Sequence, residues 1–295
     1  MPVVPARRFS TALIDLHVHT TASDGVLAPD SLVLRAKSAG ITALSVTDHD
    51  TTAGLAVARE AARCLDIRFV DGIEITAVEA DRDVHVLGYF FDPDDDQLGA
   101  FLERQREDRV RRVHEIVARL AAAGWHIDAE PVLAAARQAG RSVGRPHIAD
   151  ALVAAGHARD RNDAFDRLVG SNGCAFVPRR GPSAVDVVAL IRAAGGIASL
   201  AHPGLTRRDD LIPALAEAGL TALEARHADH DGEAEARYRR LALQHGLAVT
   251  GGSDFHADGD HHVGTIGQSG LSLEDFAALQ ERVPPKRRIG EGERL

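Results

Sequence analysis

Residues 12–19 have the sequence ALIDLHVH, in which polar side chains alternate with apolar ones from Asp15 onward. A repeat of two residues is that of a β-strand, so His17 and His19 lie on one face of the strand, about 7 Å apart along it. Two imidazole groups in that arrangement can bind one metal ion. We therefore interpret residues 12–18 as a first strand that contributes to a metal site.

A rhythm of short apolar strands and amphipathic helices continues outward from this stretch. Further strands are predicted at residues 41–46, 67–73, 84–91, 175–178, 196–200, 221–225 and 247–250. Helices are predicted at residues 29–39, 52–65, 97–123 and 183–194. Strands that alternate with helices are typical of a parallel sheet or barrel. Residues 97–174 carry helical patterns, so we expect an inserted helical lid between two barrel segments, residues 1–96 and 175–295.

Potential metal ligands stand at the ends of these strands. The second strand runs into His49, the third into Glu74, and the fourth carries His85. Two later strands run into His202 and into Asp254-Phe255-His256. The carboxyl ends of parallel strands meet at one edge, where α/β proteins keep their active sites. A single histidine is more often structural, but recurrence at six strand ends indicates one common site.

The ligand types restrict the metal and the chemistry. Imidazoles and carboxylates without thiolates favour zinc, manganese or iron in a catalytic site over a structural zinc. These residues outnumber what one ion requires, so more than one ion is expected, with the Glu74 carboxylate as a bridge. A multinuclear centre acidifies water and holds a phosphoryl group, which suits the hydrolysis of phosphate esters.

Composition excludes several other classes of protein. The 295 residues contain two cysteines, too few for a disulfide framework, and we expect a cytoplasmic protein. No apolar run is long enough for a signal peptide or a membrane span. A net charge of −9 argues against a broad basic face that would bind duplex DNA. A local basic pocket for a nucleotide or a short RNA stays compatible with that charge.

The ligand segments resemble the motifs of the PHP (polymerase and histidinol phosphatase) superfamily. The resemblance lies in His17-Val18-His19, Thr47-Asp48-His49, the segment around His202 and Asp254-Phe255-His256. It implies a distorted (β/α)7 barrel with three divalent metal ions. The implied ligands are His17, His19, Glu74 and Asp254 for one ion, Glu74, His85 and His202 for a second, and Asp24, His49 and His256 for a third. Glu74, His202 and Asp254 are the expected catalytic residues.

Two carboxylates refine this expectation. Asp24 stands where many members of the superfamily have histidine. A harder oxygen ligand favours manganese or iron over an all-zinc centre, with manganese preferred. We expect Asp48 to orient a ligand histidine, a common arrangement around metal sites.

The helical insert and Gly144-Arg145-Pro146-His147 resemble the branch that contains nucleoside 3′,5′-bisphosphate phosphatases and the RNase AM type of 5′-to-3′ exoribonuclease. Arg145 precedes a proline that would begin a helix, so its guanidinium and the helix N-terminus together form an anion site. Arg179 faces either phosphate or solvent. His227 is carried over as a substrate contact, although its preceding residues depart from the aromatic residue that we expect there.

Three other functions remain open. A histidinol-phosphate or other small-metabolite phosphatase would use the same metals. An amidohydrolase would share the first histidine pair, and many amidohydrolases use a carboxylated lysine at a strand end. Lys37, in a helix, and Lys286, in the tail, are both unsuited to that role. A non-catalytic metal-binding or nucleic-acid-binding module would have an incomplete or closed set of ligands.

Overall fold

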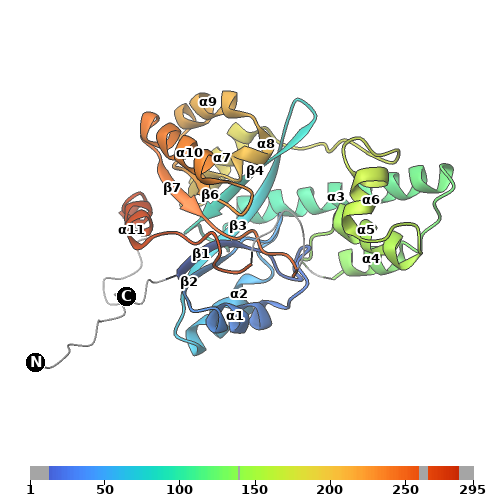
Figure 1. The fold of residues 1–295 in the computed structure, drawn as a ribbon, viewed down its shortest axis with the longest axis horizontal. Helices are drawn as coiled ribbons and strands as arrows, with labels where there is room; N and C mark the ends of the chain where they lie inside the picture. The colour runs from blue at the N-terminus through green and yellow to red at the C-terminus, as the bar shows by residue number, and fades with distance from the viewer. Residues whose placement is uncertain (1–12, 139, 259–264, 286–295) are drawn as a thin grey trace, which may run out of the picture.

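A seven-stranded sheet, with its strands in chain order from β1 to β7, organises the described residues of this computed structural model, which are 13–138, 140–258 and 265–285 (Figure 1). The strands are β1 Leu13–Val18, β2 Ile41–Val46, β3 Arg68–Glu79, β4 Arg82–Tyr89, β5 Ile197–Leu200, β6 Ala222–Arg226 and β7 Ala248–Gly251. Six of these strands lie close to their predicted positions, whereas β3 extends six residues beyond its predicted end. The α/β class is confirmed.

The direction of β4 departs from the predicted parallel order. β1, β2 and β3 pair in parallel, and so do β5, β6 and β7, whereas β4 is antiparallel to both of its neighbours. The two-residue link Ala80-Asp81, with left-handed φ values of 50° and 63°, joins β3 directly to β4. A link that short can connect only antiparallel strands. The sheet is therefore mixed.

The chain after β7 returns to the first strand. The Asp254 amide donates a hydrogen bond to the His17 carbonyl at 2.7 Å, and the His19 amide donates to the Phe255 carbonyl at 2.9 Å. Further along, the Leu271 amide donates to the Ile14 carbonyl at 2.7 Å. These bonds tie both ends of the sheet to one another.

Amphipathic helices cover the outside of the sheet. Their bounds are α1 Pro29–Ser38, α2 Leu55–Cys64, α7 Ala184–Ala193, α8 Pro203–Thr206, α9 Ile212–Glu217, α10 Gly232–Gln244 and α11 Leu273–Glu281. α1 packs on β2, α2 on β3, α7 on β3 to β5, α10 on β6 and α11 on β7. Buried aliphatic side chains of these helices and the strands form the main core. Among the described helices, none is both long and apolar enough to cross a membrane.

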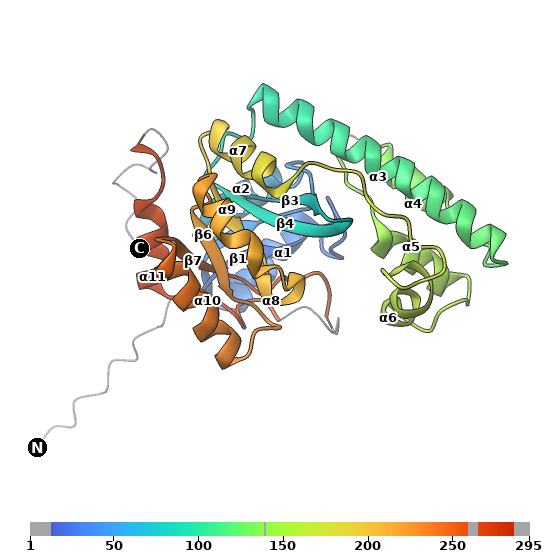
Figure 2. The ribbon, with the colours of Figure 1, turned by 90° about the horizontal axis from the view of Figure 1, so that it is seen from above.

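A second group of helices lies between β4 and α7 in the sequence. It consists of α3 Asp96–Ala122, α4 Glu130–Ala136, α5 Arg145–Ala154, α6 Arg161–Ala164 and a π-helical turn, Phe165–Val169. α3 begins beside the sheet and extends away from it to pack with the others (Figure 2). These helices share a small core of their own that includes Ile116, Ile148 and Leu168.

The predicted strand at residues 175–178 is wrong. This segment is irregular, and its carbonyl groups accept hydrogen bonds from arginine side chains of α3 in place of a neighbouring strand. Arg112 Nε donates to the Val177 carbonyl at 2.8 Å, and Arg119 donates to the Phe176 carbonyl. The apolar run that suggested a strand packs instead into the helical group through Ala175 and Val177.

The close approach of β2 and β3 at Gly72 can be tested by substitution. A Cβ atom at this buried glycine would lie 2.8 Å from both the Val46 carbonyl oxygen and Thr47 Cγ2. Gly72→Ala should therefore lower the free energy of unfolding by about 1–3 kcal/mol in urea titrations. Gly99→Ala, at an exposed position of α3 with no neighbour within 4 Å, is the control and should be neutral or stabilising. Equal stability of both variants would contradict this account.

Candidate metal centre

All nine predicted ligands gather at one edge of the sheet. They are His17, His19, Asp24, His49, Glu74, His85, His202, Asp254 and His256. Eight of them lie in or after five parallel strands, β1, β2, β3, β5 and β7. His85 lies near the start of β4, and the reversed direction of that strand brings it to the same edge.

A first group surrounds the end of β1. His17 Nε2 lies 3.3 Å from Glu74 Oε2 and 3.2 Å from Asp254 Oδ1. His19 Nε2 lies 3.2 Å and 3.1 Å from the same two oxygens. The two-residue period of β1 thus directs both imidazoles at one pair of carboxylates. This is the ligand set implied for the first ion.

Glu74 connects this group to a second. Its Oε1 atom lies 2.8 Å from His85 Nδ1 and 3.0 Å from His202 Nε2, the ligand set implied for the second ion. Its Oε2 atom also lies 3.1 Å from His49 Nδ1. One carboxylate therefore contacts both groups, which is the arrangement that a bridging ligand requires.

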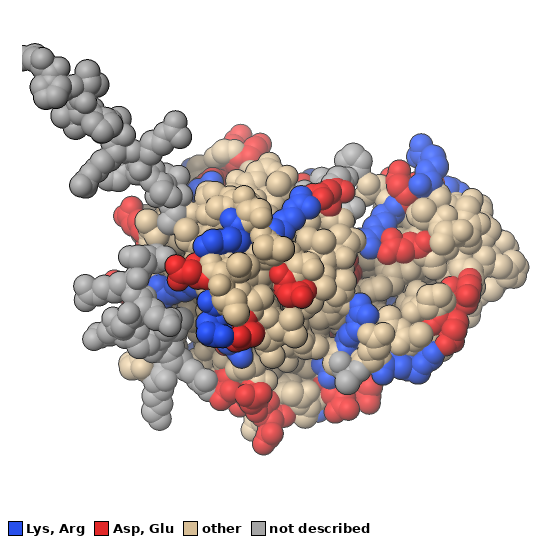
Figure 3. Space-filling view, turned by 90° about the horizontal axis from the view of Figure 1, so that it is seen from below, with Lys and Arg blue, Asp and Glu red and all other residues tan. Residues whose placement is uncertain are grey.

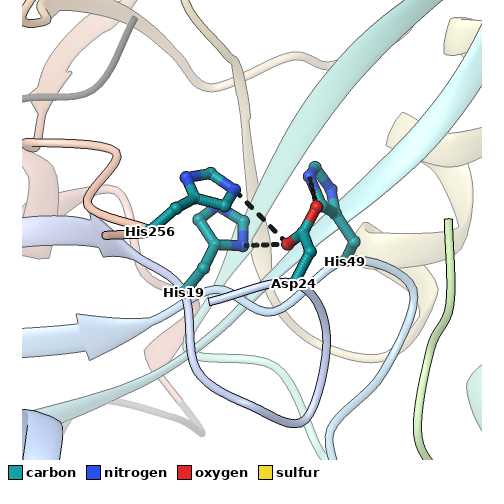
Figure 4. Close-up of side chains that lie close together, drawn as sticks. All are labelled: His19, Asp24, His49 and His256. Atoms are coloured by element: carbon teal, nitrogen blue, oxygen red, sulfur yellow. Dashed lines mark ion pairs between the residues drawn. The ribbon is translucent and has the colours of Figure 1, made fainter. Parts of the chain in front are cut away.

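A third group centres on Asp24 (Figure 4). Its carboxylate lies 3.3 Å from His256 Nε2, 3.7 Å from His49 Nε2 and 3.8 Å from His19 Nδ1. The predicted set of Asp24, His49 and His256 is brought together, with His19 as an unpredicted fourth member. His19 and His49 thus each face two groups.

Nine buried side-chain atoms of the ligand residues lack hydrogen-bond partners within the described part of the chain. They are His17 Nε2, both nitrogens of His19, Asp24 Oδ1, His49 Nδ1, Glu74 Oε2, His85 Nδ1, His202 Nδ1 and Asp254 Oδ1. A buried polar atom without a partner costs about 1–3 kcal/mol. Divalent cations would supply the missing partners, and a donor set of imidazoles and carboxylates suits them. The residues present therefore fit a metal centre.

The buried carboxylates of these groups are stabilised by neighbouring positive charge. Burial alone would raise the pKa of Glu74, but neighbouring imidazoles hold it well below its usual value, and the same holds for Asp254. Burial alone would lower the pKa of His19, but Asp254 and Glu74 raise it to about 10. Burial lowers the pKa of His49 to about 3, so this imidazole is neutral and free to bind metal.

Glu224 is a functional residue that the sequence analysis missed. Its buried carboxylate accepts a hydrogen bond from His17 Nδ1 at 2.9 Å and from the His202 amide at 2.7 Å. These bonds fix the ring of one proposed ligand and the backbone of another. The signal in the sequence is an acidic residue within the apolar strand β6.

The predicted role of Asp48 is wrong. Its carboxylate accepts hydrogen bonds from the Thr20 amide at 2.7 Å, from Thr20 Oγ1 at 2.6 Å and from Ser23 Oγ at 2.6 Å. Within the described residues these partners include no histidine. Asp48 therefore stabilises the turn that precedes Asp24 and positions that carboxylate.

His227 lies behind the first group. Its Nδ1 atom accepts a hydrogen bond from the Asp229 amide at 3.1 Å, so Nε2 carries the proton that faces Asp254 Oδ2 at 3.3 Å. The side chain is fully buried. This position makes His227 a partner of Asp254, and the substrate contact predicted for it stays a prediction.

A small cavity of about 110 Å³ adjoins the second and third groups. Its wall includes His49, His85 and Asp24 together with four arginines, Arg109, Arg112, Arg145 and Arg179. Arg145, at the start of α5, lies 3.3 Å from Asp83 Oδ2 and packs over the ring of Phe165. The cavity is therefore rich in guanidinium groups beside the metal ligands.

Asp50 anchors two of these arginines, and the sequence analysis did not identify it. Its buried Oδ2 atom accepts hydrogen bonds from Arg109 Nε at 2.7 Å and from Arg179 Nη1 at 3.1 Å. Its Oδ1 atom accepts from the Thr76 amide at 2.9 Å. Arg179 is therefore buried against the cavity, whereas Arg180 is exposed.

The charges on the surface are mixed. On the face drawn in Figure 3, basic and acidic side chains of the described residues are interspersed over the sheet domain and the helical group. That face has no broad basic area of the kind that binds duplex DNA. The basic residues at the site lie within the cavity.

Comparison with known proteins agrees with this geometry. The model of the PHP domain matches residues 15–186, which include the ligands from His17 to His85 and the helices α3 to α6. The chain belongs to the PHP family. The resemblance found in the sequence is thereby confirmed.

Three relatives cover most of the chain. A 3′,5′-nucleoside bisphosphate phosphatase of Chromobacterium violaceum is 34% identical over 84% of this chain and 89% of its own length. A phosphoribosyl 1,2-cyclic phosphate 1,2-diphosphodiesterase of Eggerthella lenta is 35% identical over 82% and 93%. A 5′-3′ exoribonuclease of Salmonella typhimurium is 35% identical over 83% and 85%. All three names describe the hydrolysis of phosphate esters, and the predicted PHP phosphoesterase is confirmed.

Two solved structures share the fold. One, provisionally assigned as a metal-dependent phosphoesterase of Bifidobacterium adolescentis, has a TM-score of 0.83 and 35% identity, and covers 94% of this chain and 96% of its own. The other, named an amidohydrolase of Chromobacterium violaceum with bound sulfate and no metal, has a TM-score of 0.81 and 31% identity over 96% and 100%. In the present chain Lys37 is exposed on α1, and Lys286 lies outside the described residues.

Metal content and stability should change together at this centre. Adding Mn²⁺ to chelator-treated protein should raise the midpoint of thermal unfolding, because ions that bind only the folded state stabilise it. Glu74→Gln should lower the bound metal, measured by elemental analysis, and reduce that stabilisation. Glu60→Gln, on the exposed surface of α2, is the control. Full metal content and full hydrolysis in Glu74→Gln would contradict the proposed bridge.

Glu224 provides a second test, because it acts on the ligands without joining them. Glu224→Gln keeps the size of the side chain but weakens the hydrogen bond that orients His17. Loss of such a partner typically reduces metal affinity about 10- to 100-fold. Titration of the variant with Mn²⁺ against a competing chelator measures this loss. Wild-type affinity would show that Glu224 has only a structural role.

Proposed function

We propose that the protein hydrolyses phosphate esters of nucleotides, with nucleoside 3′,5′-bisphosphates or the 5′ ends of short RNA as substrates. The observation that carries this proposal is the arginine-lined cavity directly beside the metal ligands. A substrate with two phosphates can place one at the metal centre and the other among the arginines. A substrate with a single phosphate cannot use both positions at once.

The proposed architecture is a distorted (β/α)7 barrel with a helical lid. The hydrogen bonds from the segment after β7 to β1 support closure of the sheet. Residues 97–174 form the proposed lid, and residues 1–96 and 175–295 the barrel. Hydrogen bonds from the Ser142 amide to the Ala22 carbonyl, at 2.9 Å, and from Thr51 to the Gly140 carbonyl support contact of the lid with the loops around the site.

The proposed ligands divide among three divalent ions, with manganese preferred. His17, His19, Glu74 and Asp254 hold the first, and Glu74, His85 and His202 the second. Asp24, His49 and His256 hold the third. The ions, when bound, supply an acidified water molecule as nucleophile and positive charge for the phosphoryl oxygens.

The chain's own residues would position the substrate. Glu74, His202 and Asp254 are the proposed catalytic residues, because each contacts the first or second group. Glu224 holds His17 and the backbone of His202 in place, and His227 orients Asp254. Arg145 and Arg179 are the proposed substrate contacts. Their guanidinium groups suit the bidentate binding of phosphate.

A second candidate substrate shares the same chemistry. The name of the relative from Eggerthella lenta describes a ribose that carries two phosphate groups, one of them cyclic. The cavity and the metal groups suit such a molecule as well. Histidinol phosphate carries one phosphate and would leave the arginines of the cavity unoccupied.

A comparison of substrates tests the proposal. Purified protein with Mn²⁺ is given a nucleoside 3′,5′-bisphosphate, a 5′-phosphorylated oligoribonucleotide, phosphoribosyl 1,2-cyclic phosphate or histidinol phosphate. We expect the highest kcat/KM for one of the first two. A preference for the cyclic phosphate would select the second candidate, and a preference for histidinol phosphate would refute both.

Arg145 should determine this preference. Loss of a charge-assisted phosphate contact costs about 1.5–3 kcal/mol, roughly 10- to 100-fold in kcat/KM. Arg145→Ala should therefore impair hydrolysis of a 3′,5′-bisphosphate by that factor and leave that of an aryl phosphate nearly unchanged. Arg137→Ala, exposed in the same helical group, is the control. Equal losses on both substrates would place Arg145 outside the substrate site.

A further inference from the structure

The backbone of His202 is strained. Its φ of 25° and ψ of 59° lie in the left-handed region, which residues that carry a Cβ atom rarely adopt. Such a conformation persists only where the surrounding contacts fix it. His202 is the N-cap residue of α8, and its ring belongs to the second ligand group. The contacts that hold this turn therefore determine where the ring of a proposed metal ligand lies.

Two side chains from β6 and the loop after it hold the turn on either side of His202. The Glu224 carboxylate accepts a hydrogen bond from the His202 amide at 2.7 Å. On the other side, the Gly204 amide donates to Nε2 of His230 at 3.1 Å. Nδ1 of His230 lies 3.0 Å from the Ala225 carbonyl oxygen of β6. His230 thus connects the turn to the strand that carries Glu224.

The two hydrogen bonds of His230 define the state of its ring. A carbonyl oxygen only accepts, so Nδ1 carries the proton, and a backbone amide only donates, so Nε2 is unprotonated. Burial lowers the pKa of His230, which favours this neutral form. Both ring nitrogens are occupied by the backbone, so His230 itself is not available as a metal ligand.

The imidazole of His230 fits closely among its neighbours. Its ring centroid lies 5.0 Å from that of Tyr238 and 5.5 Å from that of His227. Gly204 approaches so closely that a Cβ atom there would lie 2.6 Å from Nε2 of His230. The φ of Gly204 is not left-handed. The approach of the imidazole, and not the backbone conformation, therefore excludes a larger residue at this position.

We propose that His230 is a positioning residue for the metal centre: its Nε2 atom holds the strained turn through the Gly204 amide, so that the ring of His202 can bind the second ion. The inference rests on the proposed metal-dependent function and adds a residue outside the ligand set. Without this acceptor the turn is free to relax. The His202 ring would then move from Glu74 Oε1, which lies 3.0 Å from its Nε2 atom.

Two substitutions at His230 test the proposal. His230→Phe keeps a planar ring but removes both hydrogen bonds, whereas His230→Gln keeps a side-chain oxygen that can accept from the Gly204 amide. Competition with a chelator measures the Mn²⁺ affinity of each protein at a temperature at which it is folded. We expect His230→Phe to weaken the affinity about tenfold, at the lower end of the range for partners of metal ligands. His230→Gln should recover most of this loss.

Three further variants make the result decisive. Gly204→Ala keeps the imidazole but displaces it, and should also weaken Mn²⁺ binding, so it replaces His230→Phe if that variant does not fold. His202→Ala removes the ligand itself and sets the largest loss to be expected. His114→Phe, at an exposed position of α3, is the matched control and should bind Mn²⁺ as the wild type does. A residue that only stabilised the fold would lower the unfolding midpoint of the metal-free protein and leave the Mn²⁺ affinity unchanged.

The outcomes separate this inference from the proposed function. Wild-type affinity in folded His230→Phe, together with a loss in His202→Ala, overturns the inference and leaves the metal centre in place. Equal losses in His230→Phe and His230→Gln also overturn it, because the acceptor would then be irrelevant. Wild-type affinity in both His230→Phe and His202→Ala refutes the assignment of His202 as a ligand as well. If His230→Gln restores the affinity but the wild type hydrolyses no nucleotide, the inference stands and the proposed function fails.

Discussion

The burial of ionisable side chains at one edge of the sheet is the constraint on which the rest of the structure depends. Six imidazoles and three carboxylates meet there, and nine of their atoms lack hydrogen-bond partners in the described residues. Burial of such a cluster raises the free energy of the folded state unless its atoms are held where cations can bind them. Three other buried carboxylates help to fix those positions: Asp15, Asp48 and Glu224. Asp15, for example, accepts hydrogen bonds from the Ser253 and Gly267 amides and so holds the segment after β7 against β1.

Much of the sheet and several of the predicted ligands follow from periodicity, whereas Asp24 and the division into ligand sets came from the family resemblance. A two-residue period fixes which side chains of β1 share a face, and the carboxyl ends of parallel strands share an edge. These rules bring His17, His49 and His202 together without knowledge of the fold. They do not account for His85, which lies near the start of its strand. His85 reaches the site because the short link between β3 and β4 makes β4 run antiparallel to β3.

The features that sequence could not provide depend on contacts between distant segments. In the sequence, Arg112 is one of several arginines on a long amphipathic helix. In the structure, it donates a hydrogen bond to the carbonyl of Val177, 65 residues further along the chain. The same contact explains the missing strand at residues 175–178, because side chains took the place of a backbone partner. The sequence could not distinguish the roles of Asp48, which follows β2, and Glu224, which lies within β6. Their hydrogen-bond partners distinguish them: one holds a turn, and the other holds a histidine.

The order of the strands has a consequence for biosynthesis. Each strand pairs with the one that precedes it in the chain, so the sheet can grow as the polypeptide leaves the ribosome. The ligands of the first group, in contrast, come from both ends: His17 lies in β1 and Asp254 follows β7. At about 5–20 residues per second, roughly 10 to 50 seconds separate the synthesis of these two residues. The first group therefore has its full set of ligands only after translation has passed the last strand.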